Sequence, residues 1–127
     1  MNIRALQRGL QYCGRVDAVR QTYHVFDGKG MFLVLSFARA RARRGSGYFN
    51  LVDKAAVDYV QGRFGGKRGG VTANSVVAAA RRTRHIPTRL LALNVLYVLV
   101  ALQRAAIVRA GEHRQLFFSV RKGRGQR

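Results

Sequence analysis

LLALNVLYVLVAL spans residues 90–102, and none of its thirteen positions carries a charged side chain. A helix needs about 20 apolar residues to cross a bilayer, so this stretch predicts a helix buried in a protein core rather than a membrane span. Pro87 suits the start of a helix and Thr88 can cap one. We therefore expect a core helix that runs from about Thr88 to Gln103.

Two further helices are predicted ahead of this one. Asp53 is a candidate N-cap, and the apolar residues after it share a helical face: Ala56, Val57, Val60 and Phe64. GGKRGG (65–70) must break that helix. Thr72 can cap a second helix, which ends in RRTRH (81–85) and whose apolar face would be formed by Ala73, Val76, Val77 and Ala80. Ile86 is isolated between polar residues, which predicts that it plugs a turn.

Strand signals occupy both ends of the chain. After the core helix, AAIVR (105–109), the turn AGEH and RQLFFSV (114–120) predict a hairpin with a basic tail behind it. At the other end we expect a short amphipathic helix with Ile3, Leu6 and Leu10 on one face. A three-stranded meander would follow, with strands at 15–26, 31–37 and 48–52 joined by the DGKG turn (27–30) and a loop at 39–47.

These elements predict an α+β fold in a single domain over residues 1–127, a length that can bury one core. Residues 1–51 would form the N-terminal helix and β-meander. Residues 52–121 would form three helices and the C-terminal hairpin, and residues 122–127 the basic tail.

The charge balance points to a polyanionic partner. The chain has 24 Lys plus Arg against 5 Asp plus Glu, a net charge of +19, and only four of the cations are Lys. Arginine suits phosphate because its planar fork donates two parallel hydrogen bonds and stays charged. A host that prefers Arg would explain Arg over Lys, but it would not explain the shortage of acids. We therefore expect nucleic acid as the partner.

The cations gather in four places. They are Arg39, Arg41, Arg43 and Arg44 in the loop RARARRGSG; Arg63, Lys67 and Arg68 at the glycine loop; Arg81, Arg82, Arg84 and Arg89 around the end of the second helix; and Arg109, Arg114, Arg121, Lys122, Arg124 and Arg127 in the hairpin and tail. The first group is expected to neutralise phosphate, because like charges so close together add no stability to a loop. The glycines would let backbone amides approach a phosphate. The third group also suits a helix C-terminus, where cations are favoured without any ligand.

The order of helix, helix, turn with a buried aliphatic, helix and hairpin resembles a winged helix-turn-helix domain. The resemblance covers about residues 52–121 and rests on VTANSVVAAARR, IPTRL, LYVLVALQRAAIV and the hairpin ending LFFSV. Within this class, VDKAAVDYV and AAIVRAGEHRQLFFSVR look similar to a winged-helix ribosomal protein of the archaeal and eukaryotic small subunit. The resemblance implies that the third helix enters the major groove. The residues on its solvent face able to read bases would be Arg89, Asn94 and Tyr97.

Catalytic and metal sites find little support. The acids are Asp17, Asp27, Asp53, Asp58 and Glu112, and only Asp17 with Asp27 could imitate the carboxylate set of a metal-dependent nuclease. His24, His85 and His113 lack metal-ligand spacing, and Cys13 stands alone, so no disulfide or Cys-based zinc site is expected. We expect neither enzyme activity, metal nor cofactor.

These observations predict a protein that binds double-stranded DNA through its phosphates, of regulatory or packaging type. Two alternatives stay open: a structural RNA-binding protein of ribosomal type, and a metal-dependent nuclease. We expect an intracellular protein, cytoplasmic or nucleoid-associated, with no membrane association. A homodimer is possible through the long apolar helix or the strand at 31–37.

Overall fold

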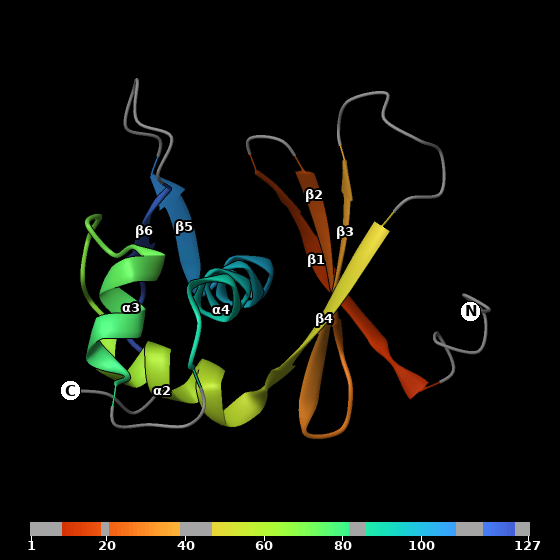
Figure 1. The fold of residues 1–127 in the computed structure, drawn as a ribbon, viewed down its shortest axis with the longest axis horizontal. Helices are drawn as coiled ribbons and strands as arrows, with labels where there is room; N and C mark the ends of the chain where they lie inside the picture. Colours follow the sequence, from red (N-terminus) through yellow and green to blue (C-terminus); the bar gives the residue numbers. More distant parts are fainter. Residues whose placement is uncertain (1–8, 19–20, 39–46, 82–85, 109–115, 124–127) are drawn as a thin grey trace.

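The computed structural model describes residues 9–18, 21–38, 47–81, 86–108 and 116–123, which form an α+β fold (Figure 1). The elements follow the chain as β1 (Gln11–Asp17), β2 (Gln21–Asp27), β3 (Met31–Ala38), β4 (Gly47–Asp53), α2 (Lys54–Phe64), α3 (Ala73–Ala79), α4 (Arg89–Ala101), β5 (Ala105–Val108) and β6 (Phe117–Val120). The first four strands form one antiparallel sheet in sequence order, and β5 pairs with β6. The N-terminal helix expected around Ile3 and Leu6 lies outside the described residues.

The stretch 15–26 is two strands rather than one, so the meander has four strands. The chain turns after Asp17: the amide of Ala18 donates to the carbonyl of Gln21 at 2.9 Å, and Thr22 Oγ1 donates to Asp17 Oδ1 at 3.1 Å. The turn contains neither Gly nor Pro, which are the residues that normally mark a reversal of the chain. A side-chain hydrogen bond to Asp17 closes it instead.

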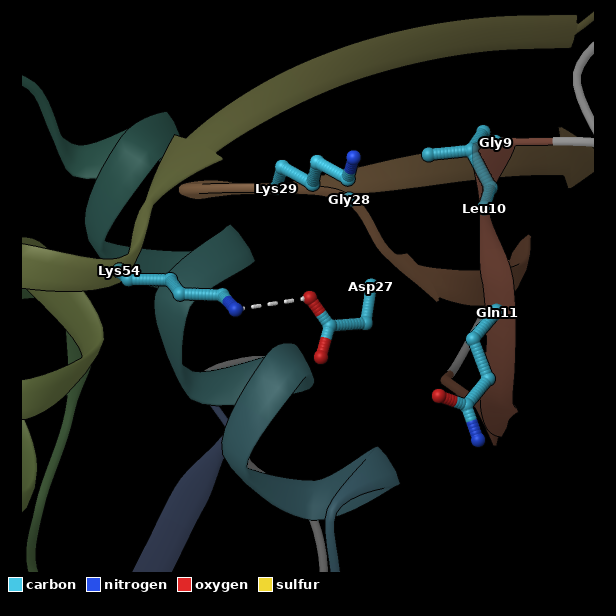
Figure 2. Close-up of a pocket in the computed structure, with 7 residues that line it drawn as sticks. All are labelled: Gly9, Leu10, Gln11, Asp27, Gly28, Lys29 and Lys54. Carbon is cyan, nitrogen blue, oxygen red and sulfur yellow. Dashed lines mark ion pairs between the residues drawn. The ribbon is translucent and has the colours of Figure 1, made fainter.

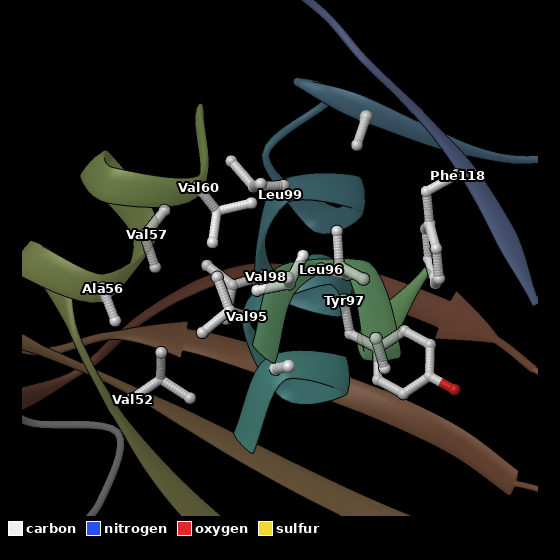
Figure 3. Close-up of a cluster of buried hydrophobic side chains, with 14 of the residues drawn as sticks. Val52, Ala56, Val57, Val60, Val95, Leu96, Tyr97, Val98, Leu99 and Phe118 are labelled. Carbon is white, nitrogen blue, oxygen red and sulfur yellow. The ribbon is translucent and has the colours of Figure 1, made fainter. Parts of the chain in front are cut away.

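Helix α4 lies against one face of the four-stranded sheet, with α2, α3 and β5 packed around its other sides (Figure 1). Six consecutive residues, Asn94 to Leu99, are buried. The core around them takes side chains from both halves of the chain, including Val52 of β4, Val60 of α2 and Phe118 of β6 (Figure 3). The prediction of a core helix here is confirmed. None of the described helices combines the length and apolarity needed to cross a membrane.

The helix starts are where the sequence predicts them. Thr72 Oγ1 accepts a hydrogen bond from the Ser75 amide at 3.1 Å, and Ser75 Oγ accepts one from the Thr72 amide at 2.9 Å, forming a capping box. Thr88 Oγ1 accepts from the Leu91 amide at 3.1 Å. Asp53 occupies the N-cap of α2, but its side chain makes no capping hydrogen bond.

The helix ends differ slightly from expectation. Helix α3 ends at Ala79, before the RRTRH stretch, and α4 ends at Ala101 because the backbone of Gln103 adopts a φ of 61°. Ile86 is buried, as expected for a residue that plugs a turn.

The C-terminal hairpin is confirmed, with strands shorter than predicted. Its register pairs Ala105 with Val120 and Val108 with Phe117. On the other edge of β6, Val71 forms an antiparallel bridge with Phe118, so the segment between α2 and α3 joins this small sheet. This bridge brings the glycine loop beside the end of β6.

Candidate nucleic-acid interface

The glycine loop is a fixed structure tied to β6. The amide of Gly66 donates to the carbonyl of Val120 at 2.7 Å, and the amide of Val120 donates to the carbonyl of Lys67 at 2.9 Å. The amides of Gly69 and Val71 donate to Ser119 Oγ and to the carbonyl of Phe118. Because these amides are bound within the chain, they are not free to bind a phosphate. Phosphate contact by this loop would therefore use its side chains or its other amides.

Two cations flank one buried aromatic ring at the start of the loop. Phe64, the last residue of α2, has its ring 5.1 Å from Lys67 Nζ and 5.6 Å from Arg63 Cζ, measured to the ring centroid. Its side chain is almost fully buried, whereas Arg63 and Lys67 are exposed. The π system of the ring attracts both cations and favours their position near the end of α2.

A third cation, Lys122, follows β6, and its side chain lies over the glycine loop. A Cβ atom added at Gly66 would stand 3.2 Å from Lys122 Cε and 3.3 Å from Lys122 Cγ, so the Lys122 stem runs directly over this glycine. Gly66 also has a φ of 91°, which side chains rarely adopt. Glycine at this position therefore allows the Lys122 side chain to lie against the loop.

Gln61 of α2 forms hydrogen bonds with two further arginines, with the side chain of Arg104 and with the backbone of Arg121. Arg104 Nη1 donates to Gln61 Oε1 at 3.2 Å, and Gln61 Nε2 donates to the carbonyl of Arg121 at 3.5 Å. The amide of Arg121 donates to the carbonyl of Arg104 at 2.9 Å. The buried amide side chain thus joins the end of α2 to the segments before β5 and after β6.

We call the resulting set the basic cluster: Arg63, Lys67, Arg104, Arg121 and Lys122. It unites three segments that are far apart in sequence, and all five residues are exposed. The ion pairs among the described residues are Arg15 with Asp17 and Lys54 with Asp27, so no acid of that part of the chain neutralises the cluster. Five exposed basic residues on neighbouring segments, with no described acid paired to them, create a potential that favours a polyanion.

The sequence predicted part of this cluster. Lys67, Arg121 and Lys122 were expected in the interface, and Arg63 was expected beside the glycine loop. Arg104 was not predicted, because its position directly after the core helix suggested only the end of that helix. It is nevertheless a basic residue like the other four. Arg68, Arg81 and Arg89 are exposed. The remaining predicted cations lie outside the described residues: Arg39, Arg41, Arg43, Arg44, Arg82, Arg84, Arg109, Arg114, Arg124 and Arg127.

The expectation that Asn94 and Tyr97 face solvent and read bases is wrong. Both side chains are buried, at 1% and 2% exposure. Asn94 Nδ2 donates to the carbonyl of Leu90 at 2.9 Å, and Tyr97 packs between Tyr23 and Phe118. Burial, and next the neighbouring Tyr23, raise the pKa of Tyr97 far above its usual range. Other elements cover the middle of helix α4, so neither Asn94 nor Tyr97 faces solvent.

Asp17 and Asp27, the two carboxylates that could imitate a nuclease site, lie far apart. Asp17 pairs with Thr22 and Asp27 pairs with Gln11, at opposite ends of the β1–β2 hairpin. Five residues of strand separate these two rungs, or about 17 Å at a rise of about 3.3 Å per residue. In the described part of the chain, no group of three or more His, Cys, Asp or Glu residues could hold a metal ion.

A pocket of about 420 Å³ lies at the other end of the hairpin from Asp17, between the segment before β1 and the β2–β3 turn (Figure 2). Lys54 Nζ stands 3.0 Å from Asp27 Oδ1 at its wall. The pKa of nearby Cys13 is raised by burial and then by Asp27. The ion pair neutralises two of the three charged residues that line the pocket, which leaves Lys29 as the third. The basic cluster is therefore the stronger candidate site.

Comparison with known proteins adds no relative. No protein-family model matches the chain, and searches of curated proteins and of solved structures found no match. The roles of the residues rest on their geometry.

Proposed function

We propose that this protein binds double-stranded DNA through the phosphate backbone, with the basic cluster as the centre of the contact. The observation that carries the proposal is the convergence of five uncompensated cations from three distant segments, in a chain of net charge +19. Folding a monomer does not require like charges to gather, so an external anion is the simplest reason for holding them together.

The order of elements supports a winged-helix reading of residues 52–121. Helix α2, the Val71 bridge, α3, α4 and the β5–β6 hairpin follow one another in the order expected for that class. The burial of Asn94 and Tyr97 removes two of the three residues proposed to read bases from α4. Arg89, in the first turn of α4, is exposed and stays in the proposal. We therefore propose strong phosphate contact with weak base readout.

The test compares two double variants that remove equal charge. Lys67→Gln/Lys122→Gln removes two cations of the basic cluster, and Arg15→Gln/Lys29→Gln removes two from the four-stranded sheet. Affinity for a short DNA duplex is measured by fluorescence anisotropy between about 50 and 200 mM salt. The logarithm of the binding constant falls with the logarithm of the salt concentration, and each lost phosphate contact makes this slope about 0.9 less steep. We expect the slope of the first variant to be about 1.8 less steep than that of the wild type, and that of the second variant to change little. Equal slopes would contradict the proposal.

The ribosomal-type alternative predicts the same dependence on salt, because RNA also carries phosphates. Competition separates the two. A structured RNA hairpin that displaces the labelled duplex at much lower concentration than unlabelled duplex would favour the RNA-binding alternative. The loop cations Arg39, Arg41, Arg43 and Arg44 can be tested in the same assay. Changing all four to Ala is expected to weaken binding and leave the melting temperature nearly unchanged.

A further inference from the structure

The four-stranded sheet has an apolar face that no described element covers. Side chains alternate across a strand, and α4 covers the face formed by Val16, Val25, Val34 and Val52. Figure 1 shows α4 on one side of the sheet only. Antiparallel sheets with one solvated face usually carry polar residues there. This outer face instead carries the apolar side chains Tyr12, Phe26, Met31, Leu33, Leu35, Phe37, Phe49 and Leu51.

Much of this face is exposed. The exposed fractions are 51% for Tyr12, 36% for Met31, 41% for Phe37, 54% for Phe49 and 52% for Leu51. Taking about 200 Å² for a fully exposed side chain of this size, these five residues expose on the order of 450 Å² of apolar surface. A standard protein–protein interface buries about 800 Å² per partner, of which roughly 57% is apolar. The exposed apolar area of this face is thus close to the apolar share of one such interface.

The charge on this face argues for a protein occupant over a nucleic acid. Arg15, Asp17 and Asp53 also point to this side, and the side chains of Arg15 and Asp17 pair at 3.4 Å. With one cation against two carboxylates, the described part of the face carries no net positive charge. Surfaces that bind nucleic acid are positively charged. In a chain of net charge +19, a face without net positive charge is also where a second copy can approach with the least repulsion.

We propose that two copies of this protein dimerise by packing the outer faces of their four-stranded sheets against each other. The inference does not depend on the proposed DNA binding. In Figure 1, α4 stands between the sheet and the small β5–β6 sheet that holds part of the basic cluster. A dimer joined through the outer faces would therefore leave both clusters on its outside.

The test is the mass of the full chain in solution by analytical ultracentrifugation, after nuclease treatment and at high salt, so that nucleic acid does not bridge copies. Leu51→Lys places a charge on the outer face. Leu90→Lys is the matched control, because Leu90 is 59% exposed on α4 and the substitution adds the same charge. We expect the wild type and Leu90→Lys to be dimers, and the dimer dissociation constant of Leu51→Lys to rise at least about tenfold, since a lysine would be buried without a partner.

A second variant distinguishes the whole face from its edge. Tyr12 lies on β1 and Leu51 on β4, the two edge strands of the sheet. Face-to-face packing requires Tyr12→Lys to weaken the dimer as well, whereas pairing through the β4 edge would leave it unaffected and overturn the proposal. A monomeric wild type, or an equal effect of Leu51→Lys and Leu90→Lys, would also overturn it. If the wild type is monomeric and Phe49→Ala weakens binding of a single-stranded oligonucleotide, the face belongs to stacked bases instead.

Discussion

Tyr97 of α4 stacks on Tyr23 of β2 with ring centroids 4.1 Å apart and an angle of 30° between the rings. The contact joins the central helix to the sheet, and the Tyr97 side chain is 2% exposed. Tyr97, which was expected to contact bases from the third helix, therefore connects the two layers of the fold.

Truncating this side chain should destabilise the protein strongly. We expect Tyr97→Ala to lower the free energy of unfolding by about 3–5 kcal/mol, as for other large aromatic residues removed from a core. Tyr97→Phe keeps the ring and should cost much less. Urea unfolding at constant salt measures both. Affinity of Tyr97→Phe for duplex DNA should equal that of the wild type, and a clear loss in a fully folded variant would return Tyr97 to the interface.

The same burial predicts a stability change at alkaline pH. In the unfolded chain Tyr97 ionises near its ordinary pKa of about 10, whereas in the folded protein its pKa is raised by burial and by Tyr23. The unfolded state therefore releases a proton that the folded state keeps, so the stabilising contribution is present below pH 10 and is lost as the pH rises above it. The free energy of unfolding of the wild type should fall more steeply above pH 10 than that of Tyr97→Phe. Parallel curves would contradict this.

Helix starts could be predicted from the sequence because their signals are local. Thr72 and Thr88 stand directly before apolar residues at helical spacing, and both cap as expected. The reversal between β1 and β2 could not be predicted in the same way. It depends on the hydrogen bond between Thr22 and Asp17, two residues five positions apart, and a lone Asp without Gly or Pro beside it is a weak turn signal.

The residues of the candidate site also differ in whether a local sequence signal predicts them. Cations that are neighbours along the chain, such as Lys67 and Arg68, form a cluster that the order of the residues alone reveals. The position of Arg104 beside Gln61 depends on how α2, β5 and β6 pack, which no local pattern encodes. The expectation for Asn94 and Tyr97 is wrong for a related reason: it assumes that these positions of the third helix face solvent, whereas the packing of the other elements buries both side chains.

Asn94 offers a site where a substitution should stabilise the fold. Its Oδ1 atom is buried and accepts no hydrogen bond in the described structure. A buried acceptor without a partner costs about 1–3 kcal/mol. Leu has the branching of Asn without polar atoms, so we expect Asn94→Leu to raise the free energy of unfolding by about 1 kcal/mol. Asn74→Leu, on the exposed surface of α3, is the control and should change it by less than about 0.5 kcal/mol. A destabilised Asn94→Leu would contradict this and would show that the hydrogen bond from Nδ2 to the Leu90 carbonyl, or the fit of the side chain, outweighs the unpaired acceptor.

The contact between Gly66 and Lys122 can be separated from backbone strain by comparing two glycines of one loop. Gly66 and Gly69 both have positive φ, of 91° and 68°, but an added Cβ meets Lys122 at Gly66 and nothing within 4 Å at Gly69. Both Ala variants should lose about 1 kcal/mol or more through strain. We expect Gly66→Ala to lose more, and the excess to shrink when Lys122→Ala is added, as measured by urea unfolding of the four single and double variants. An excess that persists without the Lys122 side chain would place its origin in the backbone, and Lys122 would then owe its position in the basic cluster to something other than this glycine.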